Sequence, residues 1–131
     1  MNADALIRRL ESFADARPAV VTSMDAADAR WKPPSGAWSV LEIVNHLADE
    51  EVEDFRQRLE LTLRDPARRW PSIDPETAAV ERRYNERDLN ESVRRFVSER
   101  RKSIEWLRGL KEPDWHATHE HKKLGPVMAG A

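Results

Sequence analysis

The sequence contains no cysteine and no long apolar run. Without cysteine the chain can form no disulfide, no thiolate metal site and no cysteine nucleophile, which fits a reducing compartment. No stretch approaches the roughly 18 apolar residues that crossing a bilayer requires, and the N-terminus lacks the apolar segment of a signal peptide. We therefore expect a cytoplasmic protein with no membrane partner.

The sequence also lacks an excess of charge of either sign, because 22 basic and 24 acidic residues leave a formal net charge of -2. No overall field attracts a polyanion, so the composition disfavours nucleic-acid binding and leaves room only for a local basic patch. Glycine-rich phosphate loops and a G-x-S-x-G elbow are absent, so nucleotide hydrolysis and triad chemistry have no support.

The chain has 131 residues, the length of one domain. Leu, Ile, Val and Phe make up about a fifth of it, too few for a large sheet, and alanine and five tryptophans supplement them. Charges of both signs fall at helical spacing, which indicates helices with charged outer faces. The sequence therefore predicts one helical domain over residues 1–131.

The first predicted helix runs from Asp4 to Met24, with a kink or break near residues 15–18 because Pro18 lacks an N–H donor. Two prolines and a glycine then predict an ordered loop over residues 25–37, pinned by Trp31. The apolar stripe of the first helix consists of Leu6, Leu10, Phe13, Val20 and Met24.

The second predicted helix has the strongest start signal in the chain. Ser39 and Glu42 match a capping box, so the helix begins at Val40, and Asp65 with Pro66 ends it. At 1.5 Å per residue it would be roughly 37 Å long, which is typical of bundles. Its apolar stripe consists of Leu41, Val44, Ala48, Val52, Phe55, Leu59 and Leu63.

After a loop over residues 64–74, Asp74 as cap and Pro75 at the first helical position predict a short helix to about Tyr84. A third long helix follows from about Leu89 and is closed by residues 109–113. The remainder looks like a loop. The predicted fold is therefore all-α, an antiparallel up-down helical bundle of three long helices and one short helix. The stripe of the third long helix consists of Leu89, Val93, Phe96, Val97, Ile104 and Leu107.

The segment Trp31–Glu51 resembles the DinB/YfiT-like superfamily of bacterial metal-binding bundles. It reads WKPPSGAWSVLEIVNHLADEE and presents, in the family's order, a proline loop, a Trp-Ser helix start, Glu42 and the pair His46-Leu47. The resemblance covers nearly the whole chain and implies a four-helix bundle. The further matching positions are Tyr84, Phe96, Arg100, Leu107 to Leu110, Asp114, Trp115 and Leu124 to Val127.

The resemblance also implies a divalent metal such as Zn²⁺, Ni²⁺ or Fe²⁺. In the family, a histidine of the second helix and two histidines of an H-x-x-x-H motif on the last helix hold the metal. Only His46 can be carried over, because this sequence contains no H-x-x-x-H. The implied function is a metal-dependent hydrolase or a thiol S-transferase acting on a small molecule or thiol, with an incomplete or absent metal site. The alternative is a non-catalytic, self-associating binding or scaffold module.

The last bundle helix of the family is missing or truncated here, because the chain ends four residues after the Gly-Pro-Val at 125–127. Three apolar stripes would then lack part of their cover, which soluble monomers rarely tolerate. We therefore expect either a truncated sequence or a homodimer in which a second copy supplies the missing contacts.

Several polar residues have two interpretations. His46 falls on the polar side of its helix and is either a metal ligand, oriented by a neighbouring carboxylate, or simply solvated. Glu42, Asp49, Glu50 and Glu53 share that face and could attract a cation or supply a general base, or could form an ordinary charged face with Glu42 occupied as a cap.

The chain end and the third long helix pose similar alternatives. His116, His119 and His121 could present imidazoles to a metal from a loop, although adventitious or no binding is favoured for a segment without a scaffold. Arg100 lies within the apolar stripe, where it either pairs with an acid of the second helix or acts as an anion clamp. We expect Trp31 and Trp38 to be core and loop anchors.

Overall fold

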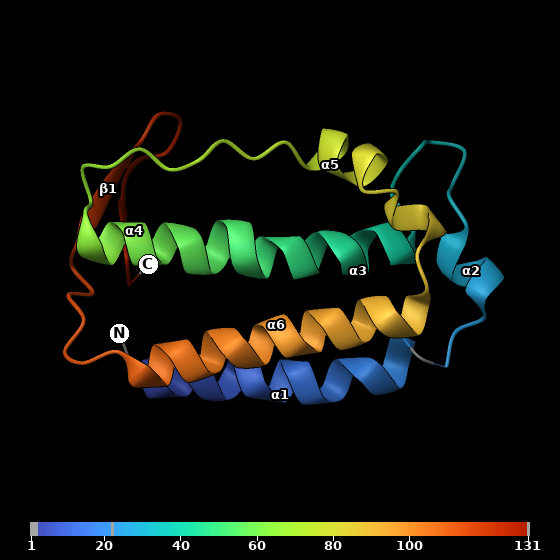
Figure 1. Cartoon of the computed structure of the whole chain (residues 1–131), viewed down its shortest axis with the longest axis horizontal. Coiled ribbons are helices and arrows are strands. Elements are labelled where there is room, and N and C mark those ends of the chain that lie inside the picture. The colour runs from blue at the N-terminus through green and yellow to red at the C-terminus, as the bar shows by residue number, and fades with distance from the viewer. Residues whose placement is uncertain (1–2, 22, 131) are drawn as a thin grey trace.

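The computed structural model describes residues 3–21 and 23–130, excluding the side chains of residues 17–20. Three long helical rods dominate the fold (Figure 1). They are α1 (Ala3–Val21), a continuous rod made of α3 (Val40–Asp49), η1 (Glu50–Arg56) and α4 (Gln57–Arg64), and α6 (Leu89–Gly109). The shorter elements are α2 (Ala26–Arg30), α5 (Pro75–Glu81), η2 (Tyr84–Glu86), β1 (Thr118–His121) and β2 (Gly125–Met128).

The predicted helical bundle is confirmed, with α6 packed against both α1 and α3. The directions of the rods differ from a simple up-down order. Asn45 bonds Ser92 and Glu51 bonds Ser103, so partner numbers rise together and the α3–η1–α4 rod runs parallel to α6. The cause is the segment after α4, which crosses back along the rod to α5 before α6 begins (Figure 1). Of the two other described rods, α1 is the one that runs antiparallel to α6, since Glu11 pairs with Arg108 and Asp15 faces Arg101.

The core is divided into two clusters of buried apolar side chains. Buried polar residues lie along the contact between α3–η1 and α6, where Asn45, Glu51 and Ser103 are inaccessible and hydrogen-bonded. No described helix has the length and apolar character needed to cross a membrane. One cluster consists of Val21, Ala29, Leu41, Val44, Leu89 and Val93, and the other of Ile7, Ile104 and Leu107.

The second rod is continuous, as predicted, but its middle third is not α-helical. Residues Glu50–Arg56 form a π-helix, in which each turn holds more residues than an α-helical turn. Residues spaced at the α-helical period of 3.6 therefore do not stay on one side of the rod along this stretch. Glu51 is 3% exposed whereas Val52 is 37% exposed, so the stripe position predicted for Val52 is wrong.

The side of the first rod that is buried also differs from the predicted apolar stripe. Ile7, Ala14 and Val21 are buried against α6, while Leu6 and Phe13 are each more than 40% exposed. The buried set recurs every seven residues and lies one position after Leu6 and Phe13. Residues 17–20, with Pro18 and Val20, lie outside the described side chains, and α1 is a single helix over its full range.

Two segments predicted as loops contain regular structure. Asp25 caps the short helix α2, and residues 118–128 form an antiparallel hairpin in which Thr118 pairs with Met128. Gly125, with φ of 72°, supplies the left-handed conformation at the hairpin turn. Trp31 does not pin the proline loop, because its side chain is 65% exposed. The Lys32 ammonium ties this loop to Glu42 instead.

Candidate functional site

The helix that carries the candidate residues begins at the predicted capping box. The Ser39 hydroxyl accepts the Glu42 backbone N–H at 3.1 Å, and the Glu42 carboxylate accepts the Ser39 N–H at 2.8 Å. Glu42 also pairs with Lys32, and these donors keep the pKa of Glu42 below its usual value despite the opposing effect of burial. Glu42 is therefore a structural acid, which confirms its interpretation as a cap.

His46 lies one turn further along α3, with its ring edge-on to Trp38 at a centroid distance of 4.9 Å. Its Nδ1 is 3.8 Å from the Glu50 Oε1, and its side chain is one quarter exposed. Partial burial lowers the pKa of His46, against the opposing charges of Asp49 and Asp54. The imidazole is therefore neutral at pH 7, the form that accepts hydrogen bonds and binds metals.

Glu50 lies beside both His46 and Asp54. Burial, a hydrogen bond with Asp54 and the Asp54 charge raise the pKa of Glu50 to about 7. The charge of Asp54 is compensated by Arg58, whose guanidinium is 2.6 Å away. Glu50 can therefore gain or lose a proton near neutral pH, which general acid–base catalysis requires.

Glu50 borders an open groove of about 480 Å³ between α1, the α3–η1–α4 rod and β2, hereafter the Glu50 groove. Two of its acids, Glu51 and Asp54, are neutralised by Arg100 and Arg58. Within the described residues Glu50 has no ion pair with arginine or lysine. His46 lies next to this groove and does not line it. The apolar wall consists of Leu10, Leu47, Phe55, Leu59, Val127 and Met128.

Asp49 was predicted on a solvated or ligand-binding face, but it is 5% exposed. Its carboxylate accepts hydrogen bonds from Arg82, Arg95 and the Tyr84 hydroxyl. These donors outweigh burial and lower the pKa of Asp49, whereas burial and the Asp49 charge raise the pKa of Tyr84 to about 12. Asp49 therefore anchors α3 to α6 and to the turn before η2.

Arg100 forms the predicted ion pair with an acid of the second helix. Its guanidinium contacts Glu51, whose side chain is 4% exposed, and lies 5.4 Å from the ring centroid of Phe96. Glu51 also accepts a hydrogen bond from Ser103 at 2.8 Å. The ion pair occupies Arg100, so the anion-clamp interpretation is not needed to explain a charge in this position.

The family follows from a match that extends over almost the entire chain. The family model for the DinB superfamily matches residues 6–131. The chain belongs to the DinB superfamily. A comparison with curated proteins gives no significant match.

A solved structure shows the same DinB-type fold. Bacillus subtilis YfiT, described as a probable metal-dependent hydrolase with an unusual four-helix bundle topology, superimposes with a TM-score of 0.83. The match covers 97% of this chain and 73% of YfiT, at 19% sequence identity. At that identity the likeness establishes the fold alone.

The metal expected in the DinB superfamily can be tested against the donors present. In residues 3–21 and 23–130, no three His, Asp or Glu side chains are grouped so that they could hold a metal ion. His46 and Glu50 offer two donors, whereas protein zinc sites use three or four protein ligands. Asp49 is already occupied by its three donors. The described residues therefore do not form a metal centre by themselves.

The three histidines near the end of the DinB-type chain are neither a solvated tail nor one cluster. His119 is buried and stacks on Trp70 at a centroid distance of 4.2 Å, and His121 lies on the same strand face. His116 precedes the strand and is exposed. The hairpin was not predicted because four-residue strands with mixed polar residues carry little periodic signal.

Two residues of the groove were not recognised from sequence. Arg58 could have been found, since Asp54 and Arg58 are spaced i,i+4 on a helix. Trp70 could not, because its place beside α4 depends on how the segment after α4 folds back onto Thr62 and on the hairpin that stacks on the indole.

Proposed function

We propose that this chain is a hydrolase that acts on a small uncharged substrate in the Glu50 groove. The observation that carries the proposal is the composition of this groove, which combines an apolar wall with two ion pairs and with Glu50, the one acid among its described lining residues that has no arginine or lysine partner. Pockets with an apolar lining and a few placed polar groups are the usual form of small-molecule sites. The likeness to YfiT supports hydrolysis as the reaction class.

In this proposal Glu50 acts first as a general base and then as a general acid. Its carboxylate takes a proton from water, and the water oxygen bonds to the carbonyl carbon of an ester. The bond from that carbon to the leaving oxygen then breaks, and Glu50 returns the proton to the leaving oxygen. The raised pKa of Glu50 comes from its burial and from its hydrogen bond with Asp54, and His46, neutral at pH 7, adds no positive charge that would lower it.

A bound divalent metal, Zn²⁺, Ni²⁺ or Fe²⁺, belongs to this proposal only with ligands supplied from outside the described residues. His46 is the family position at which such an ion would be held. Thiol S-transfer is the second reaction that the superfamily resemblance implies. A small thiol added to the assay tests it, because the thiol would compete with water for the substrate.

Replacing Glu50 by glutamine should abolish the activity. With p-nitrophenyl butyrate as an uncharged test ester, kcat/KM of the unmodified protein should rise with pH through about 7, as Glu50 ionises. Glu50→Gln should lower kcat/KM by about 100-fold or more and remove this pH dependence. The matched control is Glu60→Gln on the same rod, whose carboxylate pairs with Arg64 and does not line the groove. Equal activity of Glu50→Gln and the control would sink the proposal.

The second candidate function is a self-associating binding module, favoured by the apolar wall of the same groove. Met128, at its rim, is 46% exposed, and a second copy seated there would cover it. Light scattering should then give a mass above the 15.2 kDa of one chain, rising with concentration. Met128→Lys should return the mass to that of one chain, while Val80→Lys on the exposed face of α5 should not. A single-chain mass for the unmodified protein at all concentrations would exclude this candidate.

A further inference from the structure

A second cleft, of about 860 Å³, lies between the hairpin and the segment that follows α4. We call it the basic cleft. Trp70 and Arg58 line both this cleft and the Glu50 groove, so the two share a wall. The residues that matter for the argument are Arg58, Arg69, Trp70, His121, Lys122 and Lys123.

The shared wall is fixed by several contacts. The Trp70 indole N–H donates to the Thr62 hydroxyl at 3.2 Å, and the indole stacks on His119 with 14° between the planes. His119 Nδ1 is 3.0 Å from the Pro66 carbonyl oxygen, which can only accept, so Nδ1 carries a proton. Arg58 lies over the indole at 5.2 Å. The cleft is therefore preformed on this side.

Three cations of the cleft are uncompensated. Across the described part of the chain, Arg69, Lys122 and Lys123 form no ion pair, and Glu120 is the single acid among the lining residues. All three cationic residues are exposed, so their charges are available to a ligand. Because the whole chain carries a net charge of -2, this positive region is a local feature that the overall charge conceals.

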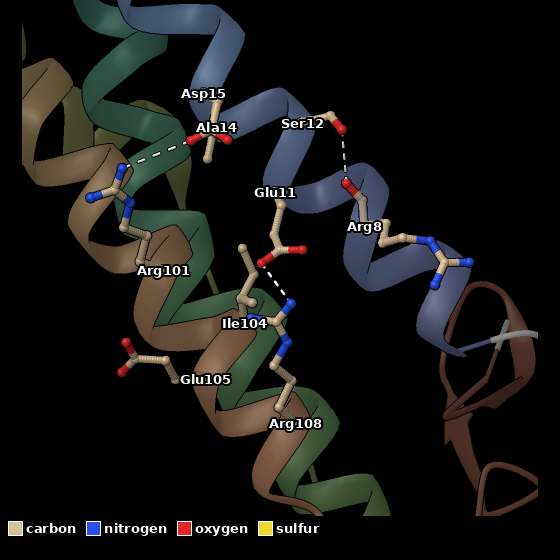
Figure 2. A pocket seen from close by; sticks show the side chains of 9 residues that line it. All are labelled: Arg8, Glu11, Ser12, Ala14, Asp15, Arg101, Ile104, Glu105 and Arg108. Atoms are coloured by element: carbon tan, nitrogen blue, oxygen red, sulfur yellow. Dashed lines mark hydrogen bonds and ion pairs between the residues drawn. The ribbon is translucent and has the colours of Figure 1, made fainter.

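A comparable groove between α1 and α6 shows what a compensated site looks like (Figure 2). It also contains three arginines, but Arg101 faces Asp15 at 3.8 Å and Arg108 pairs with Glu11 at 2.7 Å (Figure 2). Glu105 is a third acid of the lining, so three arginines and three acids leave this groove without net charge, although Glu105 and Arg8 are not paired with each other (Figure 2). Two grooves of one molecule therefore differ in their net charge although each contains several cations.

The hairpin turn adds a neutral donor to the basic cleft. His121 Nδ1 accepts the backbone N–H groups of Lys123 and Leu124 at 3.3 and 3.2 Å. The neutral ring therefore carries its proton on Nε2, which makes Nε2 a hydrogen-bond donor. The same turn holds Lys122 and Lys123 beside the cleft.

We propose that the basic cleft binds a small polyanion that carries phosphate or carboxylate groups. The Arg69 guanidinium can bind two oxygens of one such group, and Lys122 and Lys123 supply point charges. A volume of about 860 Å³ falls within the range of small-molecule sites. The fixed Trp70 side chain closes one side of the cleft. Because one face of its indole is already covered by His119, the charged side chains determine which ligand is recognised.

Isothermal titration calorimetry with inorganic pyrophosphate, and separately with citrate, tests the proposal at low ionic strength. We expect binding of at least one anion, weakening as salt is added. The double variant Arg69→Gln with Lys122→Gln should weaken this binding at least tenfold. The matched control, Arg8→Gln with Arg101→Gln, removes the same two charges from the α1–α6 groove and should change affinity less than twofold.

Two results would overturn the proposal. One is that neither anion binds, and the other is that the two double variants weaken binding equally, which would indicate a response to net charge alone. All four substituted side chains are exposed, so the melting temperatures should stay close to that of the unmodified protein. A circular dichroism melt of each variant checks this.

Discussion

Arg100→Met is expected to lower the free energy of unfolding by about 3–5 kcal/mol, because it leaves a buried carboxylate without its partner. Glu51 is 3% exposed and keeps only the hydrogen bond from Ser103 once the guanidinium is gone. Urea denaturation with an unchanged m-value would measure the loss.

The double variant Arg100→Met with Glu51→Leu separates the two sources of that loss. It removes both charges, so most of the stability should return if the unpaired carboxylate was the cause. Arg108→Met is the control, since Arg108 pairs with Glu11 near the surface and should contribute about 1 kcal/mol or less. A fully stable Arg100→Met would show that water already reaches Glu51.

Asp49→Asn should cost about 3 kcal/mol, because three donors lose the charge that they surround. Arg82 and Arg95 are partly exposed and can turn to solvent, whereas the Tyr84 hydroxyl is buried and cannot. The effect should therefore be slightly smaller than that of Arg100→Met. Thermal and urea unfolding at pH 7 measure it, with Asp65→Asn, at the exposed residue that follows the rod, as the neutral control.

Asp49 should also determine part of the loss of folding stability at low pH. The folded-state pKa of Asp49 is lowered, so its stabilising contribution is present above the ordinary value near 3.9 and is lost as pH falls through the folded value. Asp49→Asn should flatten the fall in stability below about pH 4. The flattening should be incomplete, since Glu42 and Glu99 also have lowered pKa values. If Asp49→Asn leaves the fall in stability below about pH 4 unchanged, the role given to Asp49 is wrong.

The sequence predicted correctly those features that depend on residues close together in the chain, such as helix caps and the buried side of a regular helix. Ser39 and Glu42 form their capping box within one helical turn, and the Asp74 side chain caps α5 by accepting the Thr77 backbone N–H. The stripe that contains Leu89, Val93 and Phe96 is buried as predicted because α6 is a regular helix that packs on both neighbours. Arg100 was identified because an isolated charge in such a stripe needs a partner.

What the sequence did not predict depends on distant partners. Asp49 and Glu53 look alike on a helical projection, yet only Asp49 meets Arg95 and Tyr84, from segments more than 30 residues away. The parallel course of the second and third rods depends on the path of the connecting segment, which periodicity does not describe. The burial of His119 likewise requires Trp70, which lies far along the chain.

The π-helix at residues 50–56 makes the spacing of the rod sensitive to insertions and deletions. Removing one residue there would rotate everything that follows by about 100° relative to α3. Thr62 would then lose its hydrogen bond with the Trp70 indole, and Arg58 would no longer line the Glu50 groove and the basic cleft. Natural variants of this domain should therefore keep the length of this stretch constant even where its residues change.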